Sequence, residues 1–480
     1  MNTVRTLHTS RALLSTGWAE NVRITLGEPE GRPDGGPGSG QQCAASDGEG
    51  RITAIQANAV AEPDDLVLAN RALLPAPVNL HSHAFQRALA GLTEYRSTSQ
   101  DSFWSWRDLM YRFVEQLDPD DIEDIAAAVQ MEMLEAGYAA CGEFHYLHHQ
   151  ADGTPHDDVA EMAVRIAASA SITGIGLTLL PVFYQRGGLD GRDLSGGQLR
   201  FGCSRDLYEK LIVSAANAVA KLNPDCNLGV APHSLRAVSS QDLSWVTALL
   251  PDAPVHIHIA EQTAEVDEVA AVYGAPPVRW LLDNATVDQR WCLVHATHMT
   301  SGEASDMARS GAVAGLCPIT ESNLGDGIFS GLEYLTAGGK IGIGSDSNVR
   351  IAMAEELRTL EYSQRLKEHQ RAVLVDGEKS VGRTLFGAVA EGGARATGRS
   401  SGRIEVGQLA DLVAIDTGAT HTMGLTGDRL LDAWIFAGDD RLVTDVFSAG
   451  RHVVREGRHI HHGEISRNFN RVVMKLRAGL

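Results

Sequence analysis

From about residue 74 onward, short apolar runs typical of buried strands alternate with segments whose apolar residues recur at helical spacing. The strand-like runs are residues 73–83, 137–146, 175–184, 227–236, 254–261, 291–298, 311–318 and 340–348. The helical patterns between them are residues 120–136, 157–171, 205–222 and 265–284. Eight strands alternating with helices predict an α/β fold, a (β/α)8 TIM-like barrel.

The two ends of the chain show a different pattern. Short apolar runs separated by turn residues fill residues 18–74, and they return in residues 402–416 and 445–457, after two further helical segments. We therefore expect a small flanking β-sandwich domain formed by both chain termini (1–73 and 401–480) beside a barrel of residues 74–400. Residues 28–50 are rich in Gly, Pro and Ser and predict a flexible surface loop.

The composition is that of a globular protein with an acidic surface. A formal net charge of −20 repels polyanions, which argues against nucleic acid or an anionic membrane as a partner. No apolar run approaches the roughly 20 residues of a membrane span, and the polar start lacks a signal-peptide core, so we expect a cytoplasmic protein. The six cysteines include no C-x-x-C pair, which indicates neither a disulfide framework nor a thiolate zinc site.

Polar residues gather where the strand-like runs end. They are His81, His83, His145, His233, Arg236, His258, Glu261, His295, His298 and Asp346. Residues two apart in an extended chain point to the same side, and barrel active sites form at the carboxyl ends of the strands. A single histidine there could instead cap a carbonyl group, and Asp346 could be a turn or helix-cap residue. The whole set favours a metal site.

Zinc fits this set, because a catalytic zinc site needs a few protein ligands and one open position. His81, His83, His258 and Asp346 supply three neutral nitrogens and one anion, which would lower the pKa of a bound water toward about 7. No lysine ends the fourth run, so we expect one ion per chain rather than two metals bridged by a carbamylated lysine. Ferrous iron (Fe2+) stays open as the metal.

The fifth run offers two candidate histidine ligands. Alternation places His256 and His258 on the same face of the strand. Glu261 follows His258 by three residues, a spacing that can put a carboxylate beside the metal for proton transfer without making it a ligand. This spacing favours His258, and the choice rests partly on the resemblance that follows.

Two motifs resemble a known family: NLHSHAFQRALAGL at residues 79–92 and DSFWSWRDLMY at residues 101–111. With the His-x-x-Glu of the fifth run, the histidine of the sixth and the aspartate of the eighth, they resemble the mononuclear deaminase branch of the amidohydrolase superfamily. The extensions of both motifs are similar to the narrower formimidoylglutamate deiminase family. The resemblance covers residues 74–346.

The resemblance implies zinc-dependent hydrolysis of N-formimino-L-glutamate to N-formyl-L-glutamate and ammonia in histidine degradation, by a homodimer. It implies that His81, His83, His258 and Asp346 hold the metal. It also implies that Glu261 and His295 serve the proton transfers and the tetrahedral intermediate, while Asp346 takes the proton of the water. The positions that it implies for substrate contact are Gln86, Arg107, Tyr146, His233 and Arg236.

The charge of the chain gives an independent argument for a dicarboxylate. Such a substrate needs local cations to enter a protein of net charge −20, and Arg107 and Arg236 follow strands at the expected active face. Arginine binds carboxylates at two points, which also fixes their orientation. Each arginine could instead form a surface salt bridge. For Trp104 and Trp106, packing of the first long loop is the favoured interpretation over lining of the site.

Two other functions remain open. One is a deaminase or dechlorinase of a heterocycle such as guanine or a triazine, whose nearly neutral substrate would not demand paired arginines. The other is a non-catalytic barrel scaffold, against which the filled ligand positions argue. We interpret the histidines near the end of the chain as an exposed, solvated cluster rather than a second metal site; they are His459, His461 and His462.

Overall fold

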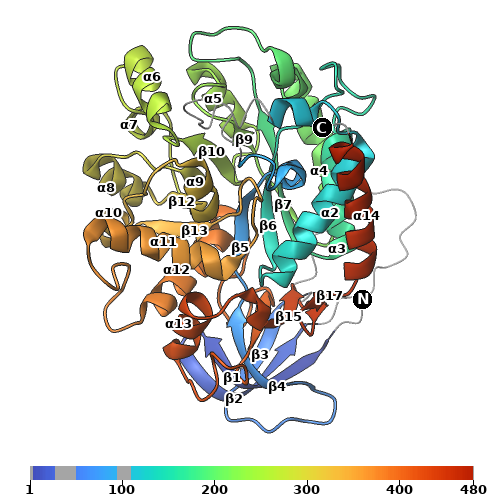
Figure 1. The fold of residues 1–480 in the computed structure, drawn as a ribbon, viewed down its shortest axis with the longest axis vertical. Helices are drawn as coiled ribbons and strands as arrows, with labels where there is room; N and C mark the ends of the chain where they lie inside the picture. The colour runs from blue at the N-terminus through green and yellow to red at the C-terminus, as the bar shows by residue number, and fades with distance from the viewer. Residues whose placement is uncertain (1–3, 28–49, 95–109, 479–480) are drawn as a thin grey trace.

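The protein is seen here in a computed structural model that describes residues 4–27, 50–94 and 110–478. The barrel strands are β5 (Val78–Ser82), β6 (Ala140–His145), β7 (Gly176–Phe183), β8 (Asn227–Leu228), β9 (Ala231–Pro232), β10 (Val255–Ile259), β11 (Trp291–His295), β12 (Val313–Leu316) and β13 (Lys340–Ile343). They pair in parallel in two sheets, β5 to β9 and β10 to β13. Bridges from Val230 to Val255 and from Ser82 to Asp346 join the sheets, which confirms the predicted barrel (Figure 1).

Helices cover the outside of the strands (Figure 1). They are α2 (Pro119–Glu135), α3 (Glu161–Thr173), α4 (Arg205–Val219), α5 (Ser240–Ala248), α6 (Thr263–Tyr273), α7 (Pro277–Asn284), α8 (Ser301–Ser310), α9 (Pro318–Leu324), α10 (Gly331–Thr336), α11 (Met353–Glu368) and α12 (Val381–Ala396), with the short 3-10 helices η1 (Ala84–Leu89) and η2 (Gly196–Arg200). The expectation of a single helix over residues 265–284 is wrong, because this region holds parts of two helices, α6 and α7. Helix α6 ends at Gly274, which is left-handed (φ 77°), and Pro277 at the start of α7 has no N–H to continue α6.

A mixed β-sheet lies beyond one end of the barrel (Figure 1). Its strand order is β17 (Arg458–His459), β16 (Arg451–Arg455), β15 (Val443–Ser448), β14 (Leu412–Asp416), β4 (Leu66–Pro75), β1 (Thr6–Leu14), β2 (Gly17–Leu26) and β3 (Ile52–Gln56). Both ends of the chain therefore build the flanking β domain, as predicted, and hydrogen bonds connect its strands in one path. The sheet has a small apolar core of its own. The domain boundaries stay a prediction.

The apolar run of residues 73–83 is not one strand. Its first three residues end β4 in the flanking sheet, and β5 begins at Val78. The prolines at positions 75 and 77 lack the N–H groups that a continuous central strand would need. The expected fourth strand is likewise divided into β8 and β9, and Val230 between them pairs with β10.

The C-terminal part adds helices that the pattern did not predict. They are α13 (Asp428–Phe436), the 3-10 helix η3 (Asp440–Leu442) and α14 (His462–Arg477). In α14, Lys475 lies 2.7 Å from carboxylate oxygens of both Asp118 and Asp121 at the start of α2. Near the start of α14, Ile465 packs against Ala127, Ala128 and Met131 of α2. This helix therefore covers α2 on its outer side.

The tail histidines correct another expectation. His459 is buried and donates from Nε2 to the carbonyl oxygen of Thr173 (2.8 Å), so it is not an exposed, solvated residue. His462 Nδ1 lies 2.7 Å from the carboxylate of Glu135, while His461 is exposed. They tie the end of the sheet to α2 and α3 and do not form a group of metal ligands among the described residues.

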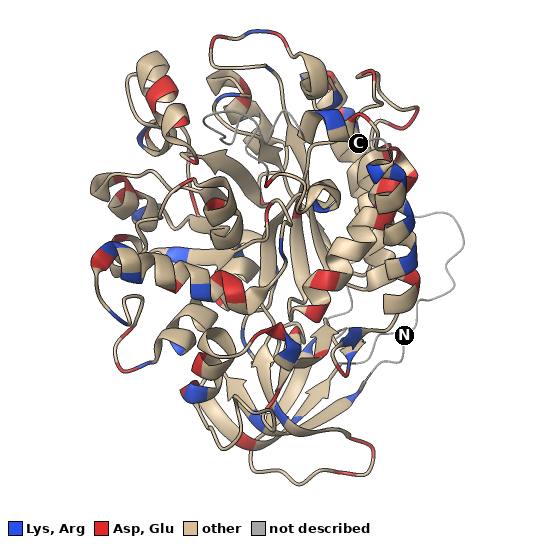
Figure 2. Cartoon of the chain, viewed as in Figure 1, with Lys and Arg blue, Asp and Glu red and all other residues tan. Residues whose placement is uncertain are grey.

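Charged side chains lie mainly on the outer helices and loops, and the barrel strands are largely uncharged (Figure 2). The cysteines among the described residues are free thiols, and all but Cys226 are buried. In the described part of the chain, no helix has the length and apolar character needed to cross a membrane. The Gly/Pro-rich loop expected at residues 28–50 falls, except for its last residue, outside the described residues.

Candidate metal and catalytic site

Four side chains converge at the carboxyl end of the barrel. His81 Nε2 lies 3.2 Å from His83 Nε2 and 3.0 Å from His258 Nε2. Asp346 Oδ1 lies 3.2 Å from His83 Nε2 and 3.6 Å from His81 Nε2. Ligands at the corners of a tetrahedron around zinc, with bonds of about 2.0–2.1 Å, stand roughly 3.3 Å apart. Three imidazole nitrogens and a carboxylate oxygen at these separations fit a single ion.

The closure of the barrel itself places these ligands. The backbone N–H of Asp346 donates to the carbonyl of His81 (3.0 Å), and the N–H of His83 donates to the carbonyl of Asp346 (2.9 Å). These bonds join the first barrel strand, β5, to the end of the last, β13. His81 and His83 lie at the end of β5, and Asp346 lies three residues beyond the end of β13, so the pairing that closes the fold brings these ligands together.

The surroundings of the imidazoles suit them to metal binding. His83 donates from Nδ1 to the carbonyl of Phe144 (2.9 Å), which leaves the lone pair on Nε2. Burial lowers the pKa of His81 to about 3. Burial and the neighbouring histidines lower the pKa of His258 well below 6.5. Deprotonated nitrogens aimed at one point are the donor set that a zinc site requires.

The structure distinguishes the two histidines of the fifth run. His258 reaches the ligand cluster, whereas His256 donates from Nε2 to the carbonyl of Ala396 (2.8 Å). Both side chains are buried. His256 therefore has a structural hydrogen bond, and of the two histidines His258 is the one whose Nε2 lies beside that of His81.

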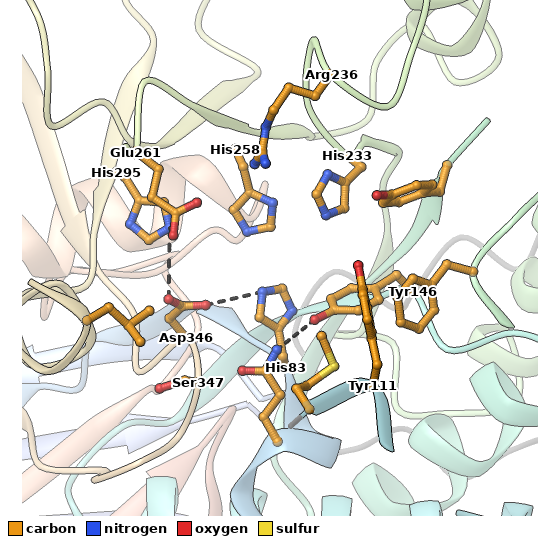
Figure 3. A pocket seen from close by; sticks show the side chains of 15 residues that line it. His83, Tyr111, Tyr146, His233, Arg236, His258, Glu261, His295, Asp346 and Ser347 are labelled. Carbon is orange, nitrogen blue, oxygen red and sulfur yellow. Dashed lines mark hydrogen bonds and ion pairs between the residues drawn. The ribbon is translucent and has the colours of Figure 1, made fainter. Parts of the chain in front are cut away.

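A second group of titratable side chains adjoins the ligands. His295 Nε2 lies 3.9 Å from both Glu261 Oε1 and Asp346 Oδ2. On its other side, His295 Nδ1 lies 3.3 Å from Glu321 Oε1, which also accepts the N–H of Cys317 (2.9 Å). Figure 3 shows Glu261, His295 and Asp346 together at one side of the cavity. The ring of His295 is thus held between acidic partners.

Burial and neighbouring charges shift Glu261 and His295 toward their protonated forms. Burial raises the pKa of Glu261, although His295 and Arg236 oppose the shift. Burial would lower the pKa of His295, but the carboxylates around it, led by Glu261, raise it to about 10. A divalent cation on the adjacent ligands would oppose both shifts. The arrangement is suited to holding and passing protons.

The backbone is strained at the same places. Ala260, His295, Ala296 and Asp346 have left-handed φ angles of 51°, 68°, 46° and 46°. Each such conformation of a non-glycine residue costs about 1 kcal/mol or more. These residues follow the ends of β10, β11 and β13, where the chain must turn to aim a functional side chain inward.

A cavity opens beside the ligands. It is lined by His83, Gln86, Met110, Tyr111, Tyr146, Tyr184, Phe201, His233, Arg236, His258, Glu261, His295, Leu324, Asp346 and Ser347. Within this lining, Gln86 donates from Nε2 to the hydroxyl of Tyr146 (2.6 Å). Arg236 points toward His258 (Figure 3). The cavity therefore combines ligand atoms, proton-carrying groups, neutral donors and a guanidinium.

The structure brings together every predicted site residue except Arg107, which lies outside the described residues with Trp104 and Trp106. Two other strand-end histidines are not part of the cavity lining: His145, which is buried elsewhere, and His298, which donates to the carbonyl of Asp326 (2.7 Å).

Sequence reasoning missed several residues around the cavity. Tyr184 directly follows β7, so its position at a strand end could have identified it. Tyr111 closes the second family-like motif but was not selected. Ser347 follows Asp346, and Glu321 lies in the short helix α9; neither carried a sequence signal of its own.

Comparison with known proteins gives a consistent result. The profile of the amidohydrolase family matches residues 72–453. The formimidoylglutamate deiminase of Pseudomonas aeruginosa is 47% identical over 472 residues, which cover 97% of this chain and 98% of that protein. The crystal structure of an amidohydrolase from Brucella melitensis is 45% identical, with a TM-score of 0.89, and covers 98% of this chain and 99% of that one. A zinc-bound adenosine deaminase from Xanthomonas campestris shares the fold at 22% identity, with a TM-score of 0.79 over 99% of both chains.

Proposed function

The chain belongs to the amidohydrolase family, and we propose that it hydrolyses N-formimino-L-glutamate to N-formyl-L-glutamate and ammonia. The observation that carries this proposal is a guanidinium, that of Arg236, in the same cavity as the four convergent ligand atoms. The formimidoylglutamate deiminase of Pseudomonas aeruginosa supports the choice of substrate through its similarity over almost the whole chain.

We propose one zinc ion per chain, held by His81, His83, His258 and Asp346. When bound, the ion would supply Lewis-acid activation of a water molecule. The described residues bring a second group of donor atoms within reach of one another, but that group shares Asp346 and adds His295 and Cys317. Burial and nearby carboxylates raise the pKa of the Cys317 thiol well above 9.0, which disfavours a thiolate ligand and supports a single ion.

Binding of a dicarboxylate would rest on the polar wall of the cavity. Arg236 supplies positive charge against the background of −20, and Gln86, Tyr146 and His233 supply hydrogen-bonding groups. We assign the second carboxylate to Arg107, on the grounds of the family-like motif that contains it. With both ends held, the formimino carbon faces the ligand cluster.

The proton transfers follow from the positions of three side chains. Asp346 Oδ2, directed toward His295, accepts a proton from the attacking water. Glu261, whose pKa is raised by burial, protonates the imine nitrogen. His295 donates a hydrogen bond to an atom bonded to the attacked carbon and stabilises the charge that develops there. Asp346 then passes the proton that it accepted to the amine nitrogen, and Glu261, now ionised, takes the proton of the added hydroxyl. The C–N bond breaks, ammonia leaves, and the formyl product remains.

We place this reaction in histidine degradation, in the cytoplasm, in a homodimer. The free cysteines of the described residues support a reducing compartment. The pathway and the dimer are supported by the family resemblance alone.

The test is ammonia release from N-formimino-L-glutamate, N-formimino-L-aspartate and guanine by the zinc-loaded enzyme. We expect kcat/KM for the glutamate derivative to exceed that for guanine by at least about 10³-fold, because a site built for charged groups rejects ligands that leave those groups unpaired. A preference for guanine would favour the heterocycle deaminase instead, and turnover of none of the three would refute the proposal.

A further inference from the structure

Glu265, in the first turn of α6, lies between two functional residues without lining the cavity. Its Oε2 accepts the backbone N–H of Glu261 (3.1 Å). Its Oε1 lies 3.9 Å from Nε of Arg236. The Glu265 side chain is 1% exposed. One carboxylate therefore faces both the proposed proton donor and the proposed carboxylate-binding arginine.

The two facing atoms are a mismatched pair. Glu265 Oε1 and Arg236 Nε are both buried, and neither has a hydrogen-bond partner among the described residues. A separation of 3.9 Å is about 1 Å longer than a charge-assisted hydrogen bond. Buried polar groups are rarely left in this state, since each unmade bond is unfavourable. A small shift of the arginine would complete the bond.

Arg236 also has a competing partner. Glu265 and Glu261 both raise the pKa of Arg236, against the effect of burial, so the guanidinium lies in the field of both carboxylates. If it paired with Glu261, that carboxyl would be held ionised and could not donate a proton. Glu265 gives the guanidinium an alternative anion, and the planar fork leaves other N–H groups for a ligand.

We propose that Glu265 is a positioning residue: it holds Arg236 away from Glu261 and turned toward a substrate carboxylate, while its other oxygen fixes the backbone of Glu261. This role rests on the proposed function, since it assumes that Arg236 binds a carboxylate of the substrate. It explains why a carboxylate is buried beside an acid that must keep its own proton.

Glu265→Gln tests the role, with Glu268→Gln as the matched control. Glu268 lies on the same helix and also raises the pKa of Arg236, but its side chain is exposed. We expect Glu265→Gln to raise KM for N-formimino-L-glutamate about tenfold, the scale of one hydrogen bond to a charged group. We expect the calorimetric Kd for glutarate, an unreactive dicarboxylate, to rise by a similar factor, and Glu268→Gln to leave both values within about twofold.

A double-mutant cycle shows whether Glu265 acts through Arg236. We expect Arg236→Gln to raise KM by about 100-fold. Adding Glu265→Gln to that variant should change KM further by less than about threefold, because Arg236, the partner of Glu265, is already absent. A purely structural role would lower the folded fraction and leave KM and the glutarate Kd unchanged.

Two outcomes would overturn the proposal: a Glu265→Gln variant that matches Glu268→Gln in KM and Kd, or an undiminished Glu265 effect in the Arg236→Gln background. If Glu265→Gln does not fold, Arg236→Lys replaces it. Lysine keeps the charge but has no fork to serve two carboxylates, so KM should rise about tenfold, and a wild-type KM would refute the role. Failure of the wild-type enzyme to turn over the substrate would instead refute the proposed function.

Discussion

Two of the regions where the molecule buries charged groups differ in their bonding: the ligand cluster at one end of the barrel and the junction with the flanking sheet at the other. At the junction, Arg399 donates to both oxygens of Asp411 (2.6 and 2.8 Å), and Arg399 and Arg451 both donate to Asp225 (2.7–2.8 Å). At the ligand cluster, Nδ1 of His81, Nδ1 of His258 and Nε of Arg236 have no hydrogen-bond partner among the described residues.

The backbone differs in the same way. None of the four junction residues is itself left-handed, although Ala449, two residues before Arg451, is (φ 43°), whereas at the ligand cluster Asp346 and the adjoining His295 are left-handed themselves. Buried ion pairs with complete hydrogen bonding hold two parts of a fold in one arrangement. Unpaired groups and strained turns persist only where the surrounding structure imposes them, and they mark the place where a ligand completes the bonding.

Loss of one ligand should have the largest effect. We expect His258→Ala to bind well under one zinc per chain and to lose activity by about 10⁴-fold or more, as when an essential catalytic group is removed. His256→Ala is the matched control, since it removes a buried imidazole from the same strand but not from the cluster. Metal analysis of both purified variants measures the difference, and a full zinc complement in His258→Ala would contradict the assigned ligand set.

Glu261→Gln should leave the metal and remove the proton donor. We expect kcat to fall by about 10² to 10⁴-fold, the usual contribution of general acid–base catalysis, with one zinc still bound. Steady-state ammonia release together with metal analysis separates the two effects. Unchanged kcat would show that Glu261 has no part in the proton transfers.

Substitutions at the junction should lower the free energy of unfolding and leave kcat unchanged. Arg399→Ala removes the ion partner of the buried Asp411 carboxylate and leaves Asp225 with Arg451 alone, and we expect the free energy of unfolding to fall by about 3–5 kcal/mol. Arg403→Ala, which breaks an exposed pair with Glu391, should lower it by at most about 1 kcal/mol. Urea unfolding measures both, and kcat of the folded enzymes should be unchanged. A large loss of kcat in folded Arg399→Ala would contradict the distinction between a junction that stabilises the fold and a ligand cluster that carries the chemistry.

The pH dependence of stability gives the smallest effect. Burial would raise the pKa of Asp225, but Arg451 and Arg399 outweigh it and hold the pKa well below 3.8. A depressed carboxyl pKa stabilises the fold above the unfolded-state value and loses that stabilisation as pH falls toward the folded-state value. Asp225→Asn should therefore be less stable than wild type at pH 7, by a margin that narrows below about pH 4. Denaturant unfolding at both pH values tests this, and a constant margin would argue against the ion pairs.

The barrel and its ligands could be predicted because the relevant signals are local. Each barrel strand is an apolar run, and His81, His83, His258 and Asp346 stand directly where such runs end. The division at Pro77 was missed because apolar composition continues through it, although the two sides belong to different sheets.

Other features depend on contacts between distant parts of the chain. Arg399 and Asp225 are 174 positions apart, and each alone is typical of a surface charge. Glu265 and Glu321 lie near helix starts, where acidic residues are common for reasons of capping and helix dipole. Only their contacts with Arg236 and His295 give them a place in the site.

The central claim is that one ion, held by three histidines and an aspartate, supports hydrolysis of a formimino dicarboxylate. The most direct measurement is the rate of ammonia release from N-formimino-L-glutamate while metal-free enzyme is titrated with zinc. The rate should rise in proportion to zinc and stop rising at one equivalent per chain. A rate independent of zinc, or one that rises to two equivalents, would contradict the account.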